Sequence, residues 1–521
     1  MTNEWSCPAE EEMDFSHPSK DIRGSVSAIL LGRTIVVGIT GSIAAVECVR
    51  LCRELIRYGA EVVPVMTPAA TRIVHPDAIW FACGKKPVLE LTGDVEHVKY
   101  CGDRRKKADL LLIAPATANT ISKIAAGIDD TPVTTFATCA IGSKIPVAIA
   151  PAMHLSMYNH PVVVENIKKL REMGIYFFMP RINENKAKFP DVDAIVDMCC
   201  RLISLNSIKT SSEEGTPDIS ERRLDYVIVA GATSVNLDNV RMLTARASGT
   251  TGMLLARELF RRGYDIELLA SPQVEAPAHL PVKRYTSVAD LFSLADKYMD
   301  TFPEQRETGK GIDWCPVFIL TAAISDFEVD EVIADNGIYE SMGMGKIPSS
   351  IKSLTVKLKP ARKLVEHINK RGFRAVLFKA ESNIDEKELV LRACKRMEES
   401  GAKMCIANLV ENVGRNSTVC IILVDRHQLE RSEELKKSGL SYFKKEERET
   451  NEKETPEVID ELIRKISGKA RCILLNRRSW YADSKEIKSV IERYDLIKYE
   501  GGKQVLCEII SDILNIMYSI K

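Results

Sequence analysis

The 521-residue chain lacks the features that mark membrane, secreted, zinc-binding and nucleic-acid-binding proteins. No apolar run reaches the ~18 residues of a membrane-spanning helix, and the acidic N-terminus MTNEWSCPAEEEMDF lacks the basic-then-apolar order of a signal peptide. The 14 cysteines form no CxxC pair and no zinc-ligand spacing. The 72 basic and 72 acidic residues cancel, so no global basic field attracts nucleic acid. We therefore expect a cytoplasmic protein with reduced thiols and with neither membrane nor nucleic-acid partners.

The composition suits folded globular domains, with 45% hydrophobic and 28% charged residues. A chain of this length predicts two or more domains. Residues 34–37 (TIVV) indicate a buried strand, residues 38–41 a glycine turn, and a helix is expected from Ser42. The pattern places four apolar residues near one helix face: Ile43, Val46, Val49 and Leu55.

This strand–turn–helix unit offers free N–H groups and a positive dipole end to a phosphate. The unit has neither a Walker lysine nor a full GxGxxG pattern, so an ordinary turn without a ligand remains an alternative. Further buried strands are expected at residues 61–66, 110–114 and 147–150. Strands that alternate with helices predict a parallel, doubly wound α/β sheet. Its strand-end loops at Gly38, Thr67, Pro115 and Pro151 should converge at one edge.

Four motifs in this half resemble the flavin-dependent cysteine decarboxylases. They are GITGSIAAVE at residues 38–47, EHV at 96–98, PATANTISKIAAGIDDTPVTT at 115–135 and PAMHLSMY at 151–158. The likeness covers residues from about 17 to about 197. It is to the decarboxylase half of the bifunctional phosphopantothenoylcysteine decarboxylase/phosphopantothenate–cysteine ligases of coenzyme A synthesis, in their archaeal form.

The resemblance implies that FMN is the cofactor and that it oxidises the cysteinyl thiol to a thioaldehyde, which makes loss of carbon dioxide easy. It implies that Gly41, Ser42 and Ile43 hold the FMN phosphate and that Thr67 lies near the ribityl chain. The resemblance also implies that residues 115–119 touch the flavin and help to build the oligomer interface around it. The residues of that stretch that we expect to bind the cofactor are Pro115, Ala116, Thr117 and Asn119.

Two histidines match catalytic positions of this family. His97 is expected to handle the thiol proton, and its ordinary pKa of ~6.5 suits proton transfer near neutral pH. His154 stands where bacterial members carry an asparagine that holds the substrate carboxylate. The alternatives are a solvated loop histidine for His97 and a structural hydrogen bond for His154. The flap cysteine of bacterial members is missing from residues 181–192, which makes Lys186 and Lys188 candidates to close over the substrate.

The second half begins after a Ser-, Thr-, Glu- and Lys-rich stretch at residues 206–223, which reads as a linker. Strands are expected at residues 226–230, 266–270, 317–321, 375–378, 404–407, 419–424 and 471–476, and helices at 251–262 and 505–520. They indicate a second α/β sheet of the dinucleotide-binding sort. A charged insertion is expected at about residues 432–458.

Residues from about 223 to about 424 resemble the ligase half of the same bifunctional family. The matching pieces are AGATS at residues 230–234, LDNVR at 237–241, AAISDF at 322–327, KI at 346–347, LKP at 358–360 and FKAE at 378–381. The likeness implies binding of CTP with Mg²⁺ on its phosphates. The residues expected to hold the nucleotide are Ala322, Asp326, Lys346 and Phe378. For Lys346 the alternative is a solvated surface lysine.

The ligase-like half departs from its family at two positions. Ala245 replaces an asparagine that attends the acyl intermediate, and Thr250 replaces a phosphate-side lysine. Alanine has no polar side-chain group to offer, and Arg246 is the candidate to compensate.

Taken together, the resemblances imply two doubly wound, Rossmann-like domains: a decarboxylase domain at residues 17–205 and a ligase domain at 224–521. The implied substrates are 4'-phosphopantothenate, cysteine and CTP. No protein-held metal site is expected, and a trimer-based or larger homo-oligomer is implied. Two alternatives remain: a decarboxylase with a non-catalytic ligase-like domain, and a non-catalytic flavin-binding partner protein.

Overall fold

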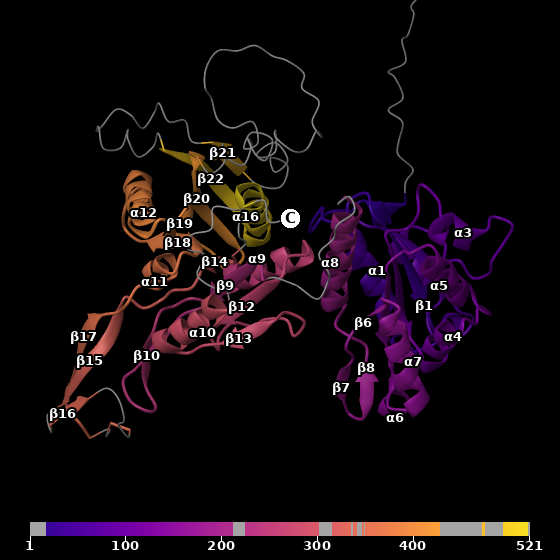
Figure 1. The fold of residues 1–521 in the computed structure, drawn as a ribbon, viewed down its shortest axis with the longest axis horizontal. Helices are drawn as coiled ribbons and strands as arrows, with labels where there is room; N and C mark the ends of the chain where they lie inside the picture. Colours follow the sequence, from indigo (N-terminus) through magenta and orange to yellow (C-terminus); the bar gives the residue numbers. More distant parts are fainter. Residues whose placement is uncertain are drawn as a thin grey trace, which may run out of the picture. The chain divides into compact units, whose positions relative to one another are not determined.

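The computed structural model describes residues 17–211, 224–301, 315–334, 337–340, 346–347, 350–427, 471–474 and 493–518. The chain divides into two compact units (Figure 1). Unit 1 comprises Met1–Thr216 with Arg261–Gly263, and unit 2 comprises Pro217–Phe260 with Tyr264–Lys521. The charged insertion expected at 432–458 lies outside the described residues, as do residues 212–223 of the expected linker.

Unit 1 is built on a five-stranded parallel sheet with the order β2-β1-β3-β4-β6. Its strands are β1 (Thr34–Ile39), β2 (Glu61–Met66), β3 (Leu110–Ala116), β4 (Val147–Pro151) and β6 (Tyr176–Phe177). β1 therefore continues through Gly38 and Ile39, which were expected to begin the turn. The strand order reverses between β1 and β3, and ligands bind at such switch points in open α/β sheets.

Helices cover both faces of this sheet, and each face has its own apolar core. One face packs on the 3₁₀ turn η2 (Ile43–Glu47), α1 (Cys48–Arg57), α2 (Pro76–Cys83) and α8 (Val192–Ser211). The other packs on α3 (Glu96–Cys101), α4 (Ala118–Ala126), α5 (Pro132–Gly142) and α7 (Pro161–Glu172). Helix α8 continues to Ser211, so the first residues of the expected linker are helical. The short turns are η1 (Pro18–Lys20), η3 (Ala70–Arg72) and α6 (Leu155–Tyr158).

The prediction of the apolar face of the first helix is wrong for its first residues. Ile43 is 78% exposed and Val46 is 51% exposed, whereas Leu55 is buried. The core stripe is instead formed by Cys48, Leu51, Cys52 and Leu55, at helical spacing. Cysteine packs here as a small hydrophobic residue, which frees the opposite side of η2 and α1 to line a cavity.

A small antiparallel sheet joins the carboxyl end of β4 to the segment before α8. It contains β5 (Met153–His154), β8 (Lys186–Lys188) and β7 (Arg181–Asn183), in that order. Glu184 and Asn185 turn between β7 and β8 with positive φ angles of 51° and 56°, the conformation of a tight hairpin turn. The hairpin and α6 lie at the same end of unit 1 (Figure 1).

Unit 2 is built on a nine-stranded sheet with the order β13-β12-β9-β14-β18-β19-β20-β22-β21. The first six strands are parallel: β9 (Tyr226–Ala230), β12 (Ile266–Ala270), β13 (Val282–Arg284), β14 (Val317–Leu320), β18 (Arg374–Glu381) and β19 (Met404–Val413). In chain order they run 3-2-1-4-5-6, the dinucleotide-binding arrangement. The last three are antiparallel: β20 (Ser417–Asp425), β21 (Arg471–Leu474) and β22 (Tyr494–Gly502).

Helices and two smaller sheets complete unit 2. The helices are α9 (Thr250–Arg261), α10 (Val288–Asp300), α11 (Leu364–Lys370), α12 (Glu386–Ser400) and α16 (Lys503–Tyr518). One small sheet pairs β10 (Ser234–Asn236) with β11 (Met242–Thr244), and the other contains β15 (Phe327–Ala334), β16 (Gly337–Glu340) and β17 (Leu354–Pro360). Among the described residues, every helix is too short or too polar to span a bilayer.

Close packing between β1 and α5 predicts opposite effects for two glycine substitutions. A Cβ at Gly38 would lie 2.9 Å from Cγ1 of Val133, whereas a Cβ at Gly142, the last residue of α5, would meet nothing within 4 Å. Gly38→Ala should destabilise unit 1 by about 1–3 kcal/mol through overpacking. Gly142→Ala should stabilise it by up to about 1 kcal/mol, because alanine is the better helix former. Calorimetric unfolding temperatures of the two variants check this, and a Gly38→Ala protein as stable as wild type would contradict the packing.

Candidate functional site

The hydroxyl of Thr40 ties the loop after β1 to the loop after β3. Thr40 is 1% exposed. Its Oγ1 donates to the carbonyl of Pro115 over 2.8 Å and accepts from the backbone N–H of Thr117 over 3.1 Å. Since both hydrogen bonds span the sheet's switch point, one side chain fixes the separation of the two loops that flank it.

The remaining strand-end loops join the same network. Ser42 Oγ donates to the carbonyl of Ala152 over 3.1 Å, and Ala152 N–H donates to the carbonyl of Ala116 over 3.0 Å. The loop after β2 touches Gly41, where a Cβ would lie 2.5 Å from that of Ala69. The loops at Gly38, Thr67, Pro115 and Pro151 therefore meet at one edge, as the sequence predicts.

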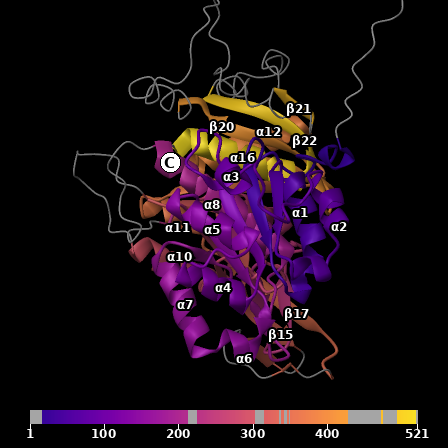
Figure 2. The same cartoon turned by 90° about the vertical axis from the view of Figure 1, so that its right-hand side faces the viewer.

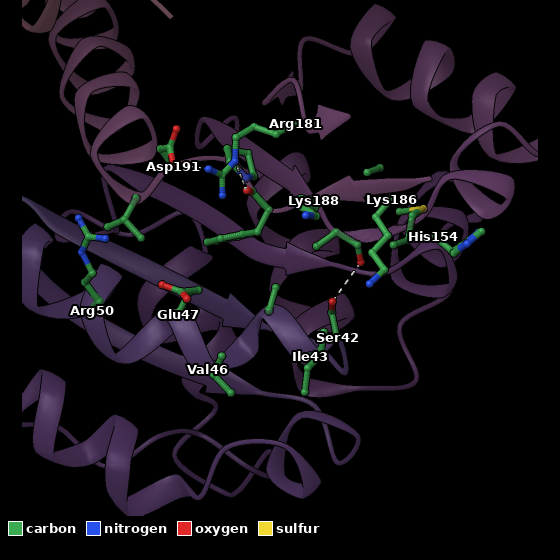
Figure 3. Close-up of a pocket in the computed structure, with 17 residues that line it drawn as sticks. Ser42, Ile43, Val46, Glu47, Arg50, His154, Arg181, Lys186, Lys188 and Asp191 are labelled. Carbon is green, nitrogen blue, oxygen red and sulfur yellow. Dashed lines mark hydrogen bonds and ion pairs between the residues drawn. The ribbon is translucent and has the colours of Figure 1, made fainter. Parts of the chain in front are cut away.

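A cavity of about 630 Å³ opens beside this junction (Figure 3). This volume lies in the ~300–1,000 Å³ range of small-molecule sites. It is lined from three directions, by η2 and α1, by β5, and by the hairpin with the segment that follows it: Ser42, Ile43, Ala44, Val46, Glu47, Arg50, Ala152, Met153, His154, Arg181, Lys186, Ala187, Lys188, Phe189, Pro190, Asp191 and Val192. Exposed Ile43 and Val46 form an apolar wall, and four cations line the same space.

Several residues expected to touch a flavin support the junction instead of lining the cavity. Thr67 is buried, and its Oγ1 accepts from the N–H of Ala70. Pro115 and Ala116 are buried and give their carbonyls to the network above, while Thr117 Oγ1 accepts from the N–H of Thr120 at the start of α4. Asn119 is exposed. Of the expected cofactor residues, Ser42 and Ile43 line the cavity, and Gly41 adjoins them.

His154 lies at the rim of the cavity and already has a structural partner. Its Nδ1 lies 2.9 Å from Ser156 Oγ and accepts from the backbone N–H of Ser156 over 3.4 Å. In Figure 3 its ring points away from the centre of the cavity. The structural hydrogen bond considered for this residue is therefore present, and it leaves Nε2 for any ligand.

His97 lies apart from the cavity in this chain. It is on α3, which packs with α5 on the sheet face opposite to η2 and α1. Figures 1 and 2 place α3 toward the end of unit 1 opposite to α6. Nδ1 of His97 is buried and has no hydrogen-bond partner among the described residues. An unpaired buried polar atom costs about 1–3 kcal/mol, so this imidazole is not held by a structural hydrogen bond through Nδ1.

In unit 2, the loops after β9 and β14 meet at the corresponding switch point. Ala232 and Ala323 form an isolated parallel bridge, and Thr233 Oγ1 accepts from the N–H of Ser325 over 2.8 Å. A Cβ at Gly249 would lie 2.8 Å from the backbone nitrogen of Gly231. Both glycines have positive φ angles, 97° at Gly231 and 68° at Gly249, which glycine adopts without strain.

The expected nucleotide residues surround this junction. Ala322 and exposed Asp326 follow β14, and Phe378 lies on neighbouring β18, one residue beyond Leu377, the partner of the last residue of β14. The carboxylate of Asp326 is paired with Lys363. Three of the four residues thus share the carboxyl edge of adjacent strands.

The fourth residue, exposed Lys346, is carried by a segment that Asp238 anchors. Oδ2 of Asp238 accepts from the N–H of Ile347 over 3.1 Å, and Oδ1 accepts from the N–H groups of Val240 and Arg241 over 2.7 and 2.6 Å. Burial raises the pKa of Asp238, but three backbone donors and the Arg241 guanidinium outweigh it and hold the pKa below its ordinary value. The motif LDNVR therefore positions the lysine segment, a role that sequence reasoning missed.

The two departures of the ligase-like half lie at the start of α9. Ala245 and Arg246 are exposed. Thr250 Oγ1 lies 2.8 Å from Ser248 Oγ, which also accepts from the N–H of Thr250. Thr250 thus takes part in a short serine turn just before α9, in which Ser248 is the acceptor.

Sequence reasoning also missed Arg50, Glu47 and Arg181 in the cavity wall. The place of Arg50 in the cavity wall could have been predicted. It lies one helical turn after Val46 and two turns after Ile43, on the same face. Arg181 had no such signal, because only the folded hairpin brings it to the cavity.

Comparisons with known proteins agree with both units. The Flavoprotein family model matches residues 24–204, and the model described as DNA/pantothenate metabolism flavoprotein C-terminal domain matches residues 222–442. The chain is 39% identical over 415 residues to the coenzyme A biosynthesis bifunctional protein CoaBC of Thermococcus kodakarensis, covering 79% of this chain and 93% of the relative.

Two further similarities complete the comparison. The chain is 33% identical to the CoaBC protein of Methanocaldococcus jannaschii, covering 80% of this chain and 94% of the relative. A solved DNA/pantothenate metabolism flavoprotein from Streptococcus pneumoniae is 20% identical, with a TM-score of 0.32, covering 38% of this chain and 88% of that one.

The hydrogen bonds of Thr40 predict that removal of its hydroxyl group destabilises unit 1. Thr40→Val keeps the side-chain shape but removes the hydroxyl, which leaves the Pro115 carbonyl and the Thr117 N–H with a lost partner. We expect a loss of about 1–3 kcal/mol, measured as a lower unfolding temperature. Thr71→Val is the control, because its hydroxyl bonds to the Pro68 carbonyl at the exposed surface. Equal, small effects of both variants would contradict the network.

The Asp238 anchor predicts a pH-dependent stability difference. Because the folded pKa is depressed, the carboxylate stabilises the fold above its unfolded pKa of ~3.9, and this contribution is lost as the pH falls through the folded pKa. Asp238→Asn should lower the unfolding temperature near neutral pH, and the gap to wild type should close below about pH 4. Exposed Asp330→Asn, which removes a surface pair with Lys359, should show little gap at any pH. A gap for Asp238→Asn that is independent of pH would exclude the ionised anchor.

Proposed function

Since the chain belongs to the CoaBC family of bifunctional coenzyme A biosynthesis proteins, we propose that it joins cysteine to 4'-phosphopantothenate with CTP and then decarboxylates the product with FMN. Decarboxylase and ligase activities follow from the family, and unit 1 is its flavoprotein part. The choice of FMN, of CTP and of the residues that hold them is our proposal. The observation that carries it is the junction of strand-end loops beside the cavity of unit 1.

The residues of the cavity fit a flavin mononucleotide. Ser42 is the N-cap of η2, and its own N–H donates to the carbonyl of Thr40 over 2.8 Å. The first N–H groups of η2, from Ile43 on, have no partner within the turn and suit a phosphate. Gly41 allows the close approach of Ala69, and exposed Ile43 and Val46 offer an apolar wall. The bound flavin would supply a reversible two-electron oxidation of the substrate thiol, the difficult step of the reaction.

The chain's own residues would bind the substrate and move its protons. His154 Nε2 is the group that would bind the substrate carboxylate, while Nδ1 keeps the ring in place through Ser156. His97 would take the thiol proton, since its buried Nδ1 has no structural partner. The tightly joined loops of Thr67 and Pro115–Asn119 would hold the flavin side of the site in place.

Because His97 lies on the face opposite to η2, one chain does not assemble the whole site. A homo-oligomer, which we expect to be trimer-based, would bring His97 of the partner subunit to the cavity. The twelve cysteines whose side chains the structure describes form no disulfide with one another, which accords with our proposal of a reducing, cytoplasmic location.

In unit 2, Ala322, Asp326 and Phe378 would hold the base and ribose of CTP at the switch point, and Lys346 would steady its phosphates as a point charge. The phosphopantothenate carboxylate would attack CTP to form an acyl cytidylate and release pyrophosphate. The cysteine amine would then attack the acyl carbon, form the amide bond and release CMP. Mg²⁺ would be held by the phosphates, since among the described residues no three acidic, histidine or cysteine side chains gather as a metal site.

A second candidate is a decarboxylase whose ligase-like half is non-catalytic. Two observations favour it: Ala245 has no polar group, and the hydroxyl of Thr250 is engaged with Ser248. Loss of one polar contact to a reaction intermediate can cost ~10²–10³-fold in rate. A product assay separates the two candidates, because only the first yields the cysteine adduct from CTP.

A crossed pair of variants tests the proposed function. With 4'-phosphopantothenate, cysteine, CTP and Mg²⁺, the wild type should release carbon dioxide and form 4'-phosphopantetheine. His97→Ala should accumulate the cysteine adduct, with decarboxylation at least ~10²-fold slower, because a general acid–base group is lost. Lys346→Ala should form adduct poorly yet decarboxylate supplied adduct normally. Mass spectrometry of the products measures both.

Each variant controls for the folding of the other. A wild-type protein that decarboxylates supplied adduct but never forms it would favour the second candidate. Decarboxylation by His97→Ala at the wild-type rate would exclude a role for the His97 imidazole in the reaction. A purified wild type without flavin absorbance that also fails to take up FMN would overturn the proposal for unit 1.

A further inference from the structure

The cavity of unit 1 contains one lysine or arginine, Lys186, that forms no ion pair among the described residues. The other cavity cations form ion pairs: Arg50 with Asp193 at 3.6 Å, Arg181 with Asp191 at 2.7 Å, and Lys188 with Glu184 at 2.9 Å. The Lys188 ammonium lowers the pKa of the Glu184 carboxyl, first through their hydrogen bond. Lys186 lines the same cavity and forms no ion pair within 4 Å among the described residues, and its charge makes only a smaller contribution to the lowered pKa of Glu184.

The hairpin fixes where Lys186 points. Lys186 pairs with His154 and Ala187 with Met153 across β8 and β5. Ala187 is 1% exposed, so it anchors the hairpin, and strand alternation turns its neighbours to the other side. In Figure 3 the Lys186 side chain points into the cavity toward the Ser42–Ala152 hydrogen bond, whereas the ring of His154 points away.

The charge balance of the cavity calls for a cation at this place. A phosphomonoester carries about −1.5 to −2 charges near neutral pH, and Glu47 adds another carboxylate to the same wall. Backbone N–H groups carry only partial positive charges, so a full cation offsets more of that charge than they do. A lysine ammonium is a compact point charge that binds phosphate well, and only Lys186 is free to do so among the cations named above.

We infer that Lys186 binds a phosphomonoester in this cavity and thereby selects phosphorylated ligands. The inference rests on the proposed function, which supplies two such groups: the phosphate of FMN and the 4'-phosphate of the substrate. The hairpin would thus take part in ligand recognition, because Lys186 lies on β8, which pairs with β5.

Binding measurements with and without the phosphate test this inference. The full chain, stripped of flavin, is titrated with FMN and with riboflavin while flavin fluorescence is followed. Flavin-loaded protein is titrated with 4'-phosphopantetheine and with pantetheine by calorimetry. Lys186→Met should weaken binding of one phosphorylated ligand about tenfold, the lower end expected for a charge-assisted hydrogen bond at an exposed site. Binding of its unphosphorylated counterpart should not change.

The ligand pair whose affinity changes shows which phosphate Lys186 binds. A loss confined to FMN assigns Lys186 to the cofactor, and a loss confined to 4'-phosphopantetheine assigns it to the substrate. Lys186→Arg should keep most of the affinity, and the wild-type affinity should fall with added salt more steeply than that of Lys186→Met. Lys188→Met is the matched comparison from the same strand face, and it should weaken binding of the phosphorylated ligand less than Lys186→Met does, because Glu184 already pairs with that charge.

Other outcomes would overturn the inference or the proposed function separately. Equal losses for phosphorylated and unphosphorylated ligands, or no loss in either pair, would exclude a phosphate role for Lys186. Equal effects of Lys186→Met and Lys188→Met would assign the loss to the hairpin as a whole. A wild-type chain that binds neither flavin would instead refute the proposed function, whatever the variants do. Circular dichroism of each variant confirms that the fold is retained.

Discussion

The candidate site of unit 1 depends on the buried hydroxyl of Thr40. A hydroxyl is the smallest side-chain group that both donates and accepts a hydrogen bond, and at this position it does both across the sheet's switch point, to Pro115 and from Thr117. Leaving either backbone group unpaired in the interior costs about 1–3 kcal/mol. The loops that flank the cavity are therefore spaced by one side chain, and the apolar wall and the hairpin lie beside an edge that it holds in place.

In unit 2 the strand-end loops are held together by different contacts. Its loops after β9 and β14 meet through backbone contact, with Gly249 close against Gly231, and through Thr233 on Ser325. A side chain at either glycine would hold the start of α9 away from the strand ends. Asp238 then fixes the segment of Lys346 with three backbone hydrogen bonds. In both units the loops after the strands form the edge of the candidate site. The charged residues are carried by separate segments: the hairpin in unit 1 and the segment of Lys346 in unit 2.

The strands and the meeting of loops could be predicted from the sequence, because short β-branched runs and glycine turns report local structure directly. The expected strands at residues 226–230 and 266–270 match β9 and β12 residue for residue. The face of the first helix could not be predicted from hydrophobicity, since Ile43 and Val46 are as apolar as the core residues and only Cys48 and Cys52 reveal the true stripe. The pairing of Lys186 with His154 is likewise a product of folding, because it depends on the register of a hairpin far along the chain.

The position of His97 supports our proposal that more than one chain forms the decarboxylase site. Its Nδ1 is buried and unpaired among the described residues, and its helix packs on the face opposite to the cavity. A buried imidazole nitrogen without a partner costs free energy in the isolated fold, so this nitrogen is available to a ligand or to another subunit. The elements that line the cavity and the helix that carries His97 thus belong to separate apolar cores, on opposite faces of one sheet.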